Sequence, residues 1–496
     1  MLKRISTLLL CLMVVASSAL LVACPSDDGD TSANVSGAAT DGFSNEAKNC
    51  GGVDVTILGY AKEGYAGAQV DIEESSEEPV EDAFFKRNTF INEQYGINID
   101  LVYPENGENA LNMLRNDMTS GLGEYDAVVN TFHNLASLAS EGLLQDIKSI
   151  GNGYIHLDKE WWDQTVIKDT LINDRIFFIN GDALVTDDEA TWAMYFNKDI
   201  VRTYSLEDPY QLVRDGKWTI DKMYELVQKV ELTHGSVKSY DPEVGDIWGM
   251  LVQTYDFQMF MQGCAQAMVD NSGDIPVLRV EEEANVNTFK KIAEFFIFDN
   301  VNVGVADYHG KWNDTPSCYD KEIQIFANGN ALFMPNAITR VSNQAMREAE
   351  INYGILPMPK RDETQTNYTS GINTYDCGVI AIPITNVENL DATCYALEAM
   401  AYYGKEMVTP EFYERTLTLK RFKDEDSGDM LDLIFRNRFY DLGTVFNFNN
   451  GADSNGTLGF YTDLIGQRSD DIISYYNTRV NVYQAGIDAL VAQCYN

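Results

Sequence analysis

A short motif near the N-terminus predicts a covalent modification of a cysteine side chain. Leu21-Val22-Ala23-Cys24 follows a positive start at Lys3 and Arg4 and an apolar run that begins at Leu8. The run is too short for a comfortable membrane span, and small residues precede the cysteine. This pattern is typical of a lipoprotein signal peptide, so we expect residues 1–23 to be removed and Cys24 to carry acyl chains. An ordinary cleaved signal peptide with an incidental cysteine is the alternative.

The segment after Cys24 predicts a tether. Residues 24–49 are rich in Ser, Asp, Gly, Thr and Asn and offer little apolar surface to bury. Such a composition favours a flexible stalk, with the folded body starting near Cys50. A body held in this way would lie at the extracellular face of the cell membrane, anchored by lipid.

Motifs for catalysis are missing from the sequence. It contains no GxSxG elbow, HExxH, P-loop or dinucleotide fingerprint, so the protein is not expected to be an enzyme. Because carboxylates are abundant, a glycosidase pair remains an alternative.

Cysteine and histidine usage speaks against a metal site. The four histidines are not near any cysteine and no CxxC pattern occurs, so we expect no structural zinc, no other metal and no cofactor. An even number of cysteines in an exported body permits disulfides but does not fix their pairing. These cysteines are Cys50, Cys264, Cys318, Cys377, Cys394 and Cys494.

Length and charge narrow the class of protein. A chain of 496 residues allows two or three domains. Its formal net charge of −40 repels phosphate backbones, which excludes nucleic acid as a partner. After the signal, no apolar run approaches the length of a membrane helix.

The first part of the body alternates strands and helices. Strands are predicted at 53–58, 97–103 and 125–129, with helices at 80–95 and 108–120 between them. This order indicates an α/β layer with mostly parallel strands, whose ligands bind beyond the carboxyl ends. Further strands are predicted at 191–196, 247–252, 331–334, 353–356 and 379–382, and further helices at 220–232, 257–264, 285–298, 390–403, 410–419, 429–439 and 470–492.

Several segments, in this order, resemble one family. They are Gly181-Asp-Ala, Ala190 to Lys198, Leu206 to Thr219, Gly354 to Lys360, and Tyr440-Asp-Leu-Gly443. Together with the lipoprotein signal, they resemble extracellular solute-binding lipoproteins of carbohydrate ABC importers, of the family 1 type common in Gram-positive gut anaerobes. The resemblance implies a mono- or oligosaccharide ligand and an ABC permease as partner. A surface sugar sensor or adhesin would share the anchor and the cleft.

The resemblance also implies a fold. It is α/β and two-lobed, like periplasmic binding proteins of type II, with an interlobe ligand cleft and several crossing strands. Crossings are expected near 195–198, 333–336 and 378–383. Lobe one would hold residues 50–194 and 335–378, and lobe two residues 195–334 and 379–496.

A sugar cleft combines polar side chains with aromatic rings, and such residues follow the predicted strands. In lobe one, Tyr60 and Tyr65 flank a glycine-rich loop, and Asn130, Phe132 and His133 follow the third strand. The tyrosines can equally be surface aromatics, and Asn130 can simply cap a helix.

The remaining candidates border the crossings and the second lobe. Trp192 can be core, and Trp312 can belong to a lid without touching the ligand. At the third crossing, a tyrosine stands where many relatives are expected to carry tryptophan. The candidates are Asp182, Trp192, Tyr255, Asp256, Trp312, Asn336, Asn373, Tyr375 and Asp376.

Overall fold

The first of the two main sheets is mostly parallel. The computed structural model describes residues 42–59, 75–104, 107–230, 233–234, 237–299, 301–418, 425–449 and 456–495. Strands β1 (Val53–Leu58), β2 (Ile97–Val102) and β3 (Ala127–Thr131) run parallel, and β12 (Gly378–Ala381) joins antiparallel to β3. We call this the first sheet; its order is β12-β3-β1-β2. Its helices are α2 (Pro79–Tyr95), α3 (Gly107–Ser120), α4 (Phe132–Ser140) and α14 (Leu390–Met407).

The second sheet is mixed and has the order β10-β4-β9-β5-β8. Strands β5, β8 and β9 run parallel, while β4 lies antiparallel to both β9 and β10. The strands are β4 (Trp192–Asn197), β5 (Trp248–Val252), β8 (Val303–Val305), β9 (Ala331–Ala337) and β10 (Tyr353–Leu356). The accompanying helices are α7 (Lys198–Thr203), α8 (Pro209–Arg214), α9 (Ile220–Val227), α10 (Asp256–Gly263), α11 (Glu283–Ala293), α12 (Cys318–Ala327), α13 (Gln344–Glu348) and α16 (Glu425–Arg436).

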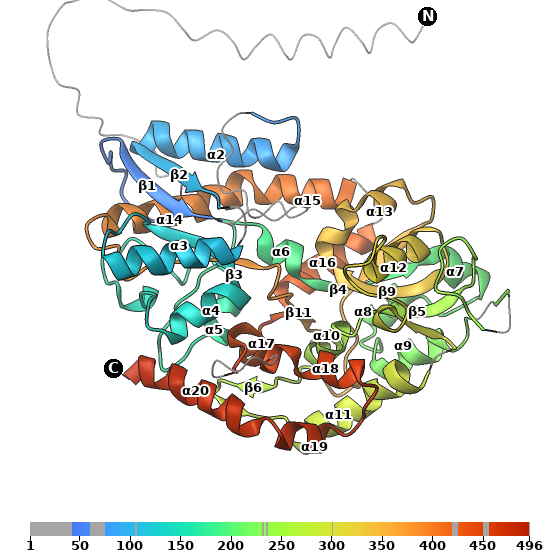
Figure 1. Ribbon diagram of the computed structural model, residues 1–496. Helices are drawn as coiled ribbons and strands as arrows, with labels where there is room; N and C mark the ends of the chain where they lie inside the picture. The colour runs from blue at the N-terminus through green and yellow to red at the C-terminus, as the bar shows by residue number, and fades with distance from the viewer. Residues whose placement is uncertain are drawn as a thin grey trace, which may run out of the picture. The chain divides into compact units, whose positions relative to one another are not determined.

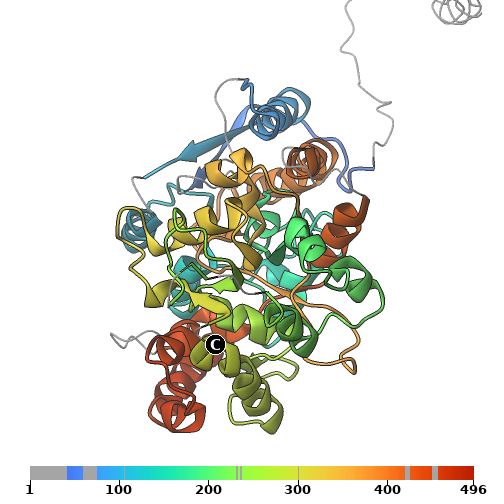
Figure 2. The ribbon, with the colours of Figure 1, turned by 90° about the vertical axis from the view of Figure 1, so that its right-hand side faces the viewer.

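The C-terminal helices lie far from α2, as both ribbon views show (Figures 1 and 2). The predicted helix over 470–492 is broken by a turn, so that α19 and α20 are separate. These helices are α17 (Leu442–Phe446), α18 (Phe460–Gly466), α19 (Ile472–Asn477) and α20 (Val480–Tyr495). Shorter elements are α5 (Gln164–Asp169), α6 (Thr186–Ala190), α15 (Thr409–Thr418), and the strand pairs β6 (Val269–Asp270) with β7 (Val277–Leu278) and β11 (Ser370–Gly371) with β13 (Arg438–Phe439).

Local sequence signals set several element ends. Gly96 ends α2 in the left-handed conformation at φ 62°, which glycine adopts without steric cost. Thr219 caps α9, its side-chain oxygen accepting a hydrogen bond from the Lys222 amide at 3.3 Å. Asn197 caps α7 in the same way, directly after β4. Gly96 and Thr219 were both predicted at these helix ends from residue type and position.

The chain passes between the sheets where three of its described segments lie side by side. Thr191 bridges Ile372 just before β4, and the adjacent β11 pairs with β13 through Ser370 and Arg438. The Asn373 amide also donates to the Ala190 carbonyl at 3.0 Å. These contacts hold together segments that lead into the first sheet and segments that lead into the second.

Strand pairing differs from the predicted lobe boundaries. Strand β10 pairs within the second sheet, although residues 335–378 were expected in lobe one. Strand β12 pairs with β3, and α14 packs on α2 and β1, so these elements accompany the first sheet rather than lobe two. The predicted crossings at 195–198 and 333–336 fall inside paired strands of the second sheet. Apolar strands of similar composition do not reveal which sheet they join.

The folded body begins before Cys50. Phe43 is only 9 % exposed and its ring lies 5.5 to 5.7 Å from the rings of Tyr95, Tyr395, Tyr402 and Tyr403. The predicted stalk over 24–49 therefore ends earlier than expected. Phe43 is the apolar residue that anchors this polar segment to the body, because its ring packs among four tyrosine rings.

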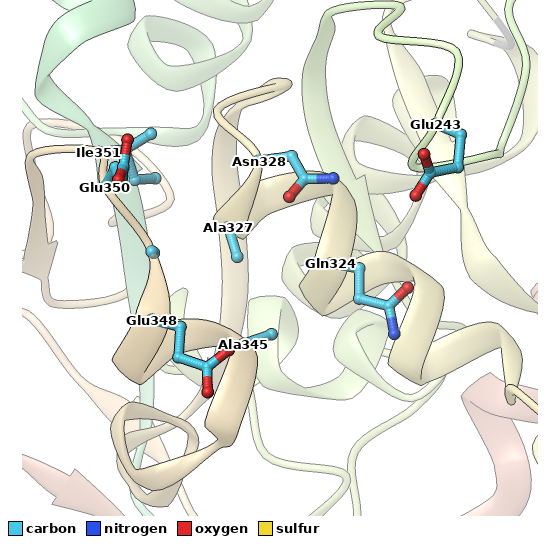
Figure 3. Close-up of a pocket in the computed structure, with 9 residues that line it drawn as sticks. Glu243, Gln324, Ala327, Asn328, Ala345, Glu348, Glu350 and Ile351 are labelled. Carbon is cyan, nitrogen blue, oxygen red and sulfur yellow. The ribbon is translucent and has the colours of Figure 1, made fainter.

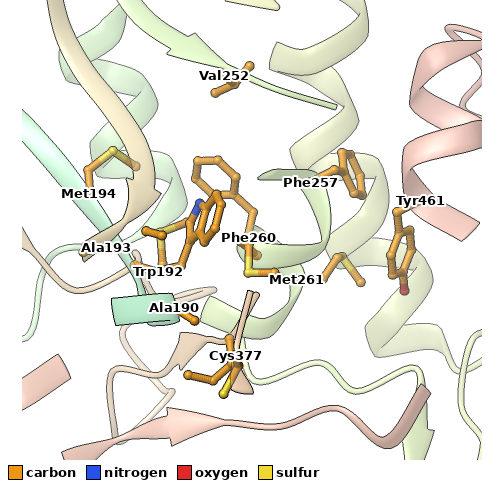
Figure 4. Packing of buried hydrophobic residues seen from close by; sticks show 14 of the residues in the cluster. Ala190, Trp192, Ala193, Met194, Val252, Phe257, Phe260, Met261, Cys377 and Tyr461 are labelled. Atoms are coloured by element: carbon orange, nitrogen blue, oxygen red, sulfur yellow. The ribbon is translucent and has the colours of Figure 1, made fainter. Parts of the chain in front are cut away.

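The cores are apolar and the six cysteines of the body are unpaired. Figure 4 shows Trp192 packed among Phe260, Met261 and Ala190, next to the buried Cys377. All six thiols are free, so packing rather than cross-links holds the described body together. Among the described helices, none combines the length and apolarity that crossing a membrane requires.

Candidate functional site

The carboxyl ends of strands from both sheets carry most of the predicted site residues. In the first sheet, β3 leads into His133, and Gly378 of β12 pairs with Thr131, which brings the preceding loop to the same edge. In the second sheet, β5 leads into Tyr255, and Trp192 at the start of β4 pairs with Ala337 at the end of β9. Ligands of open α/β sheets bind at such edges.

Four aromatic side chains form a continuous row from one edge to the other. The ring of His133 lies 4.7 Å from that of Tyr375, which lies 6.0 Å from that of Tyr255. The Tyr255 ring lies 5.6 Å from that of Trp192. We call His133, Tyr375, Tyr255 and Trp192 the aromatic row. Tyr375 is 39 % exposed whereas Trp192 is 2 % exposed, so the row runs from an accessible ring to a buried one.

Asn373 fixes the middle of the row. Its Oδ1 accepts hydrogen bonds from the Tyr255 hydroxyl at 3.1 Å and from the Tyr375 amide at 3.0 Å. Its Nδ2 donates to Asp376 Oδ2 at 2.6 Å. The predicted residues Asn373, Tyr375 and Asp376 thus act as one unit that orients both tyrosine rings.

Burial shifts the titration of this region toward neutral forms. It lowers the pKa of His133 and raises that of Tyr375. The buried His133 Nδ1 has no hydrogen-bond partner within the described chain. An unpaired buried nitrogen beside an accessible ring is a place where a polar ligand group would gain a hydrogen bond.

Asp256 holds the buried end of the row. Its Oδ1 accepts a hydrogen bond from Trp192 Nε1 at 2.9 Å, and its Oδ2 accepts one from the Gln253 amide at 2.7 Å. Burial, together with the nearby Glu322, raises the pKa of Asp256 well above its usual range. Asp256 is completely buried, so it positions Trp192 and does not face solvent. This location differs from the predicted role as a direct ligand contact.

A cavity of about 500 Å³ opens beside His133. Helix α4, the end of α17 and helix α20 enclose it, and the rings of Phe446 and Phe448 stack at 5.8 Å on one side. Its polar lining includes Asn134, Ser137 and Glu141. Its size lies in the range usual for small-molecule sites. The side of the cavity formed by the end of α17 was not predicted from the sequence, because the α17 segment follows no predicted strand.

Other predicted residues lie apart from the row. Phe132 is fully buried against Phe178 and Tyr440, which leaves no ring face for a ligand. Asn130 is also buried, and its Oδ1 accepts from the Thr131 amide and from Asn134 Nδ2, both at 2.8 Å. The predicted aromatic platform at Phe132 is therefore core.

Two further candidates differ sharply in exposure. Asp182 is half-buried, accepts a hydrogen bond from the Thr409 hydroxyl and has a pKa raised to about 7 by burial. It belongs to the packing of α15, not to the row. Trp312 is 72 % exposed, in the loop that follows β8 at the edge of the second sheet. Tyr60 and Tyr65 lie outside the described residues, as does Cys24.

Asn336 lies at the end of β9 and is buried. Its Oδ1 accepts from the Ala337 amide and from Arg340 Nε, both at 3.0 Å. It therefore orients an arginine that sequence reasoning did not single out. The sequence signal that could have identified Arg340 is a charged residue soon after a strand. Arg340 comes four residues after Asn336, however, in a segment without a recognisable motif.

Buried charges gather where the chain passes between the sheets. The Arg438 guanidinium contacts Asp163 at 3.4 Å and Asp187 at 3.2 Å, and it also pairs with Asp188. Its Nε donates to Thr191 Oγ1 at 3.1 Å. We call Arg438 with these three carboxylates the junction. Burial raises the pKa of Asp187 to about 6, although Arg438 opposes the shift.

A second, larger groove lies at the opposite edge of the second sheet. Figure 3 shows Glu243, Gln324, Asn328, Glu348 and Glu350 around it; its volume is about 580 Å³. Asn328 follows α12 just before β9 begins, so this groove faces the amino end of that strand. It contains no residue predicted for the site. Within the described residues, no group of three or more His, Cys, Asp or Glu is placed to hold a metal ion.

Family comparison agrees with this arrangement of two sheets. The model of the bacterial extracellular solute-binding proteins matches residues 68–377, more than half of the chain. The chain belongs to this family. A search of curated protein sequences finds no match.

Solved structures show the same fold at low sequence identity. A substrate-binding protein of an ABC transporter from Listeria monocytogenes, in complex with cycloalternan, is 11 % identical with a TM-score of 0.53, covering 87 % of this chain and 98 % of that one. MalX from Streptococcus pneumoniae with maltopentaose is 15 % identical with a TM-score of 0.52, covering 87 % and 99 %. An open sugar transporter structure from Rhizobium etli is 13 % identical with a TM-score of 0.55, covering 89 % and 98 %. The predicted α/β fold of periplasmic binding proteins is confirmed.

Proposed function

We propose that this protein captures a carbohydrate between its two sheets and delivers it to the permease of an ABC importer. The observation that carries the proposal is the aromatic row, which links the carboxyl edges of both sheets through Tyr375 and Tyr255. Sugars offer CH faces that stack on such rings and hydroxyls that need hydrogen-bond partners. Similar folds crystallised with cycloalternan and maltopentaose support the choice of ligand class.

The proposed binding site centres on Tyr375 and His133. Tyr375 supplies an accessible ring face, and His133 supplies an unpartnered buried Nδ1 and also lines the adjacent cavity. Trp312, exposed at the edge of the second sheet, is proposed as a further stacking surface. Tyr60, Tyr65 and the orienting residues Asn373 and Asp376 complete the proposed set. No catalytic step is proposed for any of them.

A thermal-shift screen tests the ligand class. Maltose, maltotetraose and maltopentaose are tested on the full-length protein beside a panel of peptides. A ligand at 100 times its dissociation constant adds about 2.7 kcal/mol of stability. We expect sugars to raise the melting temperature and peptides not to. Stabilisation by peptides alone would refute the carbohydrate proposal.

Closure around the ligand is tested separately. Residues 190–192, 370–373 and 438–439, which connect the sheets, are the proposed hinge. Small-angle scattering should show compaction when the confirmed sugar is added. An unchanged radius of gyration at saturating ligand would contradict capture by closure.

We also propose that Cys24 carries the lipid that holds the protein at the extracellular face of the membrane, with residues 1–23 removed as the signal peptide. The lipoprotein motif before Cys24 and the polar segment after it support this. The wild-type protein should partition into detergent, and Cys24→Ser should remain in the aqueous phase. Equal partitioning of both proteins would contradict the anchor.

A further inference from the structure

Arg340, at the carboxyl edge of the second sheet, forms no ion pair with the residues that the structure describes. It follows β9 in a short helical turn, Ile338–Ser342, and is half-buried. The only hydrogen bond of its side chain within the described residues runs from Nε to Asn336 Oδ1, at 3.0 Å. No carboxylate of the described residues lies within ion-pair distance of it. Both Nη atoms are thus left to a partner that the described chain does not supply.

Nearby carboxyl groups do not compensate this charge. Burial raises the pKa of Glu322 to about 8 and that of Asp256 well above its usual range, which disfavours the ionised form of both groups. Asp307, whose charge also raises the pKa of Glu322, already accepts hydrogen bonds from the Thr254 amide at 2.7 Å and the Tyr319 hydroxyl at 2.9 Å.

Arg340 lacks an ion pair with the described residues although the chain is rich in carboxylates. Acidic residues number 76 against 36 lysines and arginines, so cations have an excess of possible partners. Asn336, which is buried, fixes Nε and leaves the planar Nη1 and Nη2 fork directed away from that bond. A guanidinium held by one edge loses little side-chain entropy when its other edge binds a carboxylate or phosphate.

Arg340 also lies at the same edge as the aromatic row. Ala337, three residues earlier, pairs with Trp192, the buried end of the row. We propose that Arg340 binds the anionic group of an acidic sugar, with Asn336 as the positioning residue that orients the guanidinium. This inference rests on the proposed function, since the row would hold the sugar rings. Because the protein repels anions at long range, one anionic group held at short range is expected rather than a polyanion.

Calorimetry on the full-length protein tests the inference. The probes are digalacturonate, trigalacturonate and glucose 6-phosphate, each beside its neutral counterpart, and maltotetraose. We expect an acidic probe to bind more tightly than its neutral counterpart. Arg340→Gln should weaken that binding roughly 10- to 100-fold and leave neutral sugars unchanged. Arg340→Lys, which keeps the charge without the fork, should recover only part of the affinity. Comparing the galacturonates with glucose 6-phosphate shows whether the anionic group that Arg340 binds is a carboxylate or a phosphate.

Arg347→Gln is the matched control, because it removes the same charge from the exposed face of α13. It should leave all affinities unchanged, and melting curves of both variants should overlay that of the wild type. If maltotetraose binds and no acidic probe does, or if Arg340→Gln behaves as Arg347→Gln, the role of Arg340 is refuted while the proposed function stands. If neither neutral nor acidic sugars bind, both the proposed function and this inference are refuted.

Discussion

The junction and the aromatic row both combine charged, polar and aromatic groups, yet they satisfy them differently. Arg438 is 9 % exposed and contacts three carboxylates, and the Tyr440 hydroxyl donates to one of them, Asp163, at 2.8 Å. In the row, Tyr375 is 39 % exposed and His133 Nδ1 has no partner among the described atoms. A region in which every buried polar group has a hydrogen-bond or ion-pair partner is typical of one that holds segments together. Polar groups without partners are typical of a region that binds a ligand.

The strongest test of this contrast removes Arg438. Arg438→Met leaves Asp163, Asp187 and Asp188 buried without a counter-charge, so the free energy of unfolding should fall by about 3–5 kcal/mol. Urea denaturation measures this. Arg214→Met is the control, because the Arg214 side chain is 38 % exposed in its ion pairs, so its loss should destabilise the protein far less than the loss of Arg438. Equal losses in both variants would show that the junction is an ordinary surface cluster.

The second test uses the pH dependence of Asp182, which packs beside the junction. Its folded-state pKa of about 7 lies above the ordinary value of 3.8, so the folded protein binds this proton more tightly than the unfolded chain does. The resulting stability is complete below about pH 4 and is lost as pH rises through 7. Asp182→Asn cannot ionise, so its stability relative to wild type should increase between pH 5 and 8, by on the order of 2–4 kcal/mol.

Denaturant titrations at several pH values measure this difference. The exposed Asp158→Asn serves as control and should show no such trend. A constant difference between Asp182→Asn and wild type across this range would mean that Asp182 ionises normally.

The third test addresses the buried end of the row. Trp192→Phe removes the hydrogen bond to Asp256 Oδ1 and leaves a buried oxygen without its donor, which should cost about 1–3 kcal/mol of stability. Trp248→Phe is the matched control: Trp248 is equally buried, but its Nε1 has no partner in the described chain. If both substitutions cost the same, the Trp192 hydrogen bond contributes nothing specific.

The smallest effect on stability is expected at the accessible end. Tyr375→Ala should weaken the affinity for a confirmed sugar about tenfold by removing the stacking face, and change the free energy of unfolding by about 1 kcal/mol or less. Phe298→Ala, at a ring 62 % exposed before β8, should leave affinity unchanged. Calorimetry gives both values. An unaltered affinity for Tyr375→Ala would remove the row from the binding site.

Sequence patterns predicted the elements better than their partners. Strand β10 was predicted at its observed bounds, and Gly96 and Thr219 marked helix ends because their chemistry is local. The expected lobes of β10 and β12 differ from the observed strand pairing, because pairing depends on contacts between distant segments. Phe43 shows the same limit, since its aromatic pocket comes from residues far along the chain.

The site could be predicted in part for the same reason. His133 and Tyr255 lie at the sheet edges, where the sequence predicted them, because strand ends identify the edge of a sheet. Phe132 was misplaced, since adjacent residues at a strand end point to opposite sides and sequence does not say which side is core. Arg340 and Arg438 were not found, because an ion pair or its absence follows from tertiary contacts alone.

The distribution of tryptophans makes the intrinsic fluorescence of the protein a probe of one loop. Trp161, Trp162, Trp192, Trp218 and Trp248 are at most 6 % exposed, whereas Trp312 is 72 % exposed. A collisional quencher in solution therefore reaches essentially one indole, and the quenched fraction of the fluorescence reports on the loop after β8. Acrylamide suits this better than iodide, because the net charge of −40 keeps anions away. A bound molecule that covers this loop would protect Trp312 from acrylamide, so occupancy could be followed by fluorescence without attaching a dye.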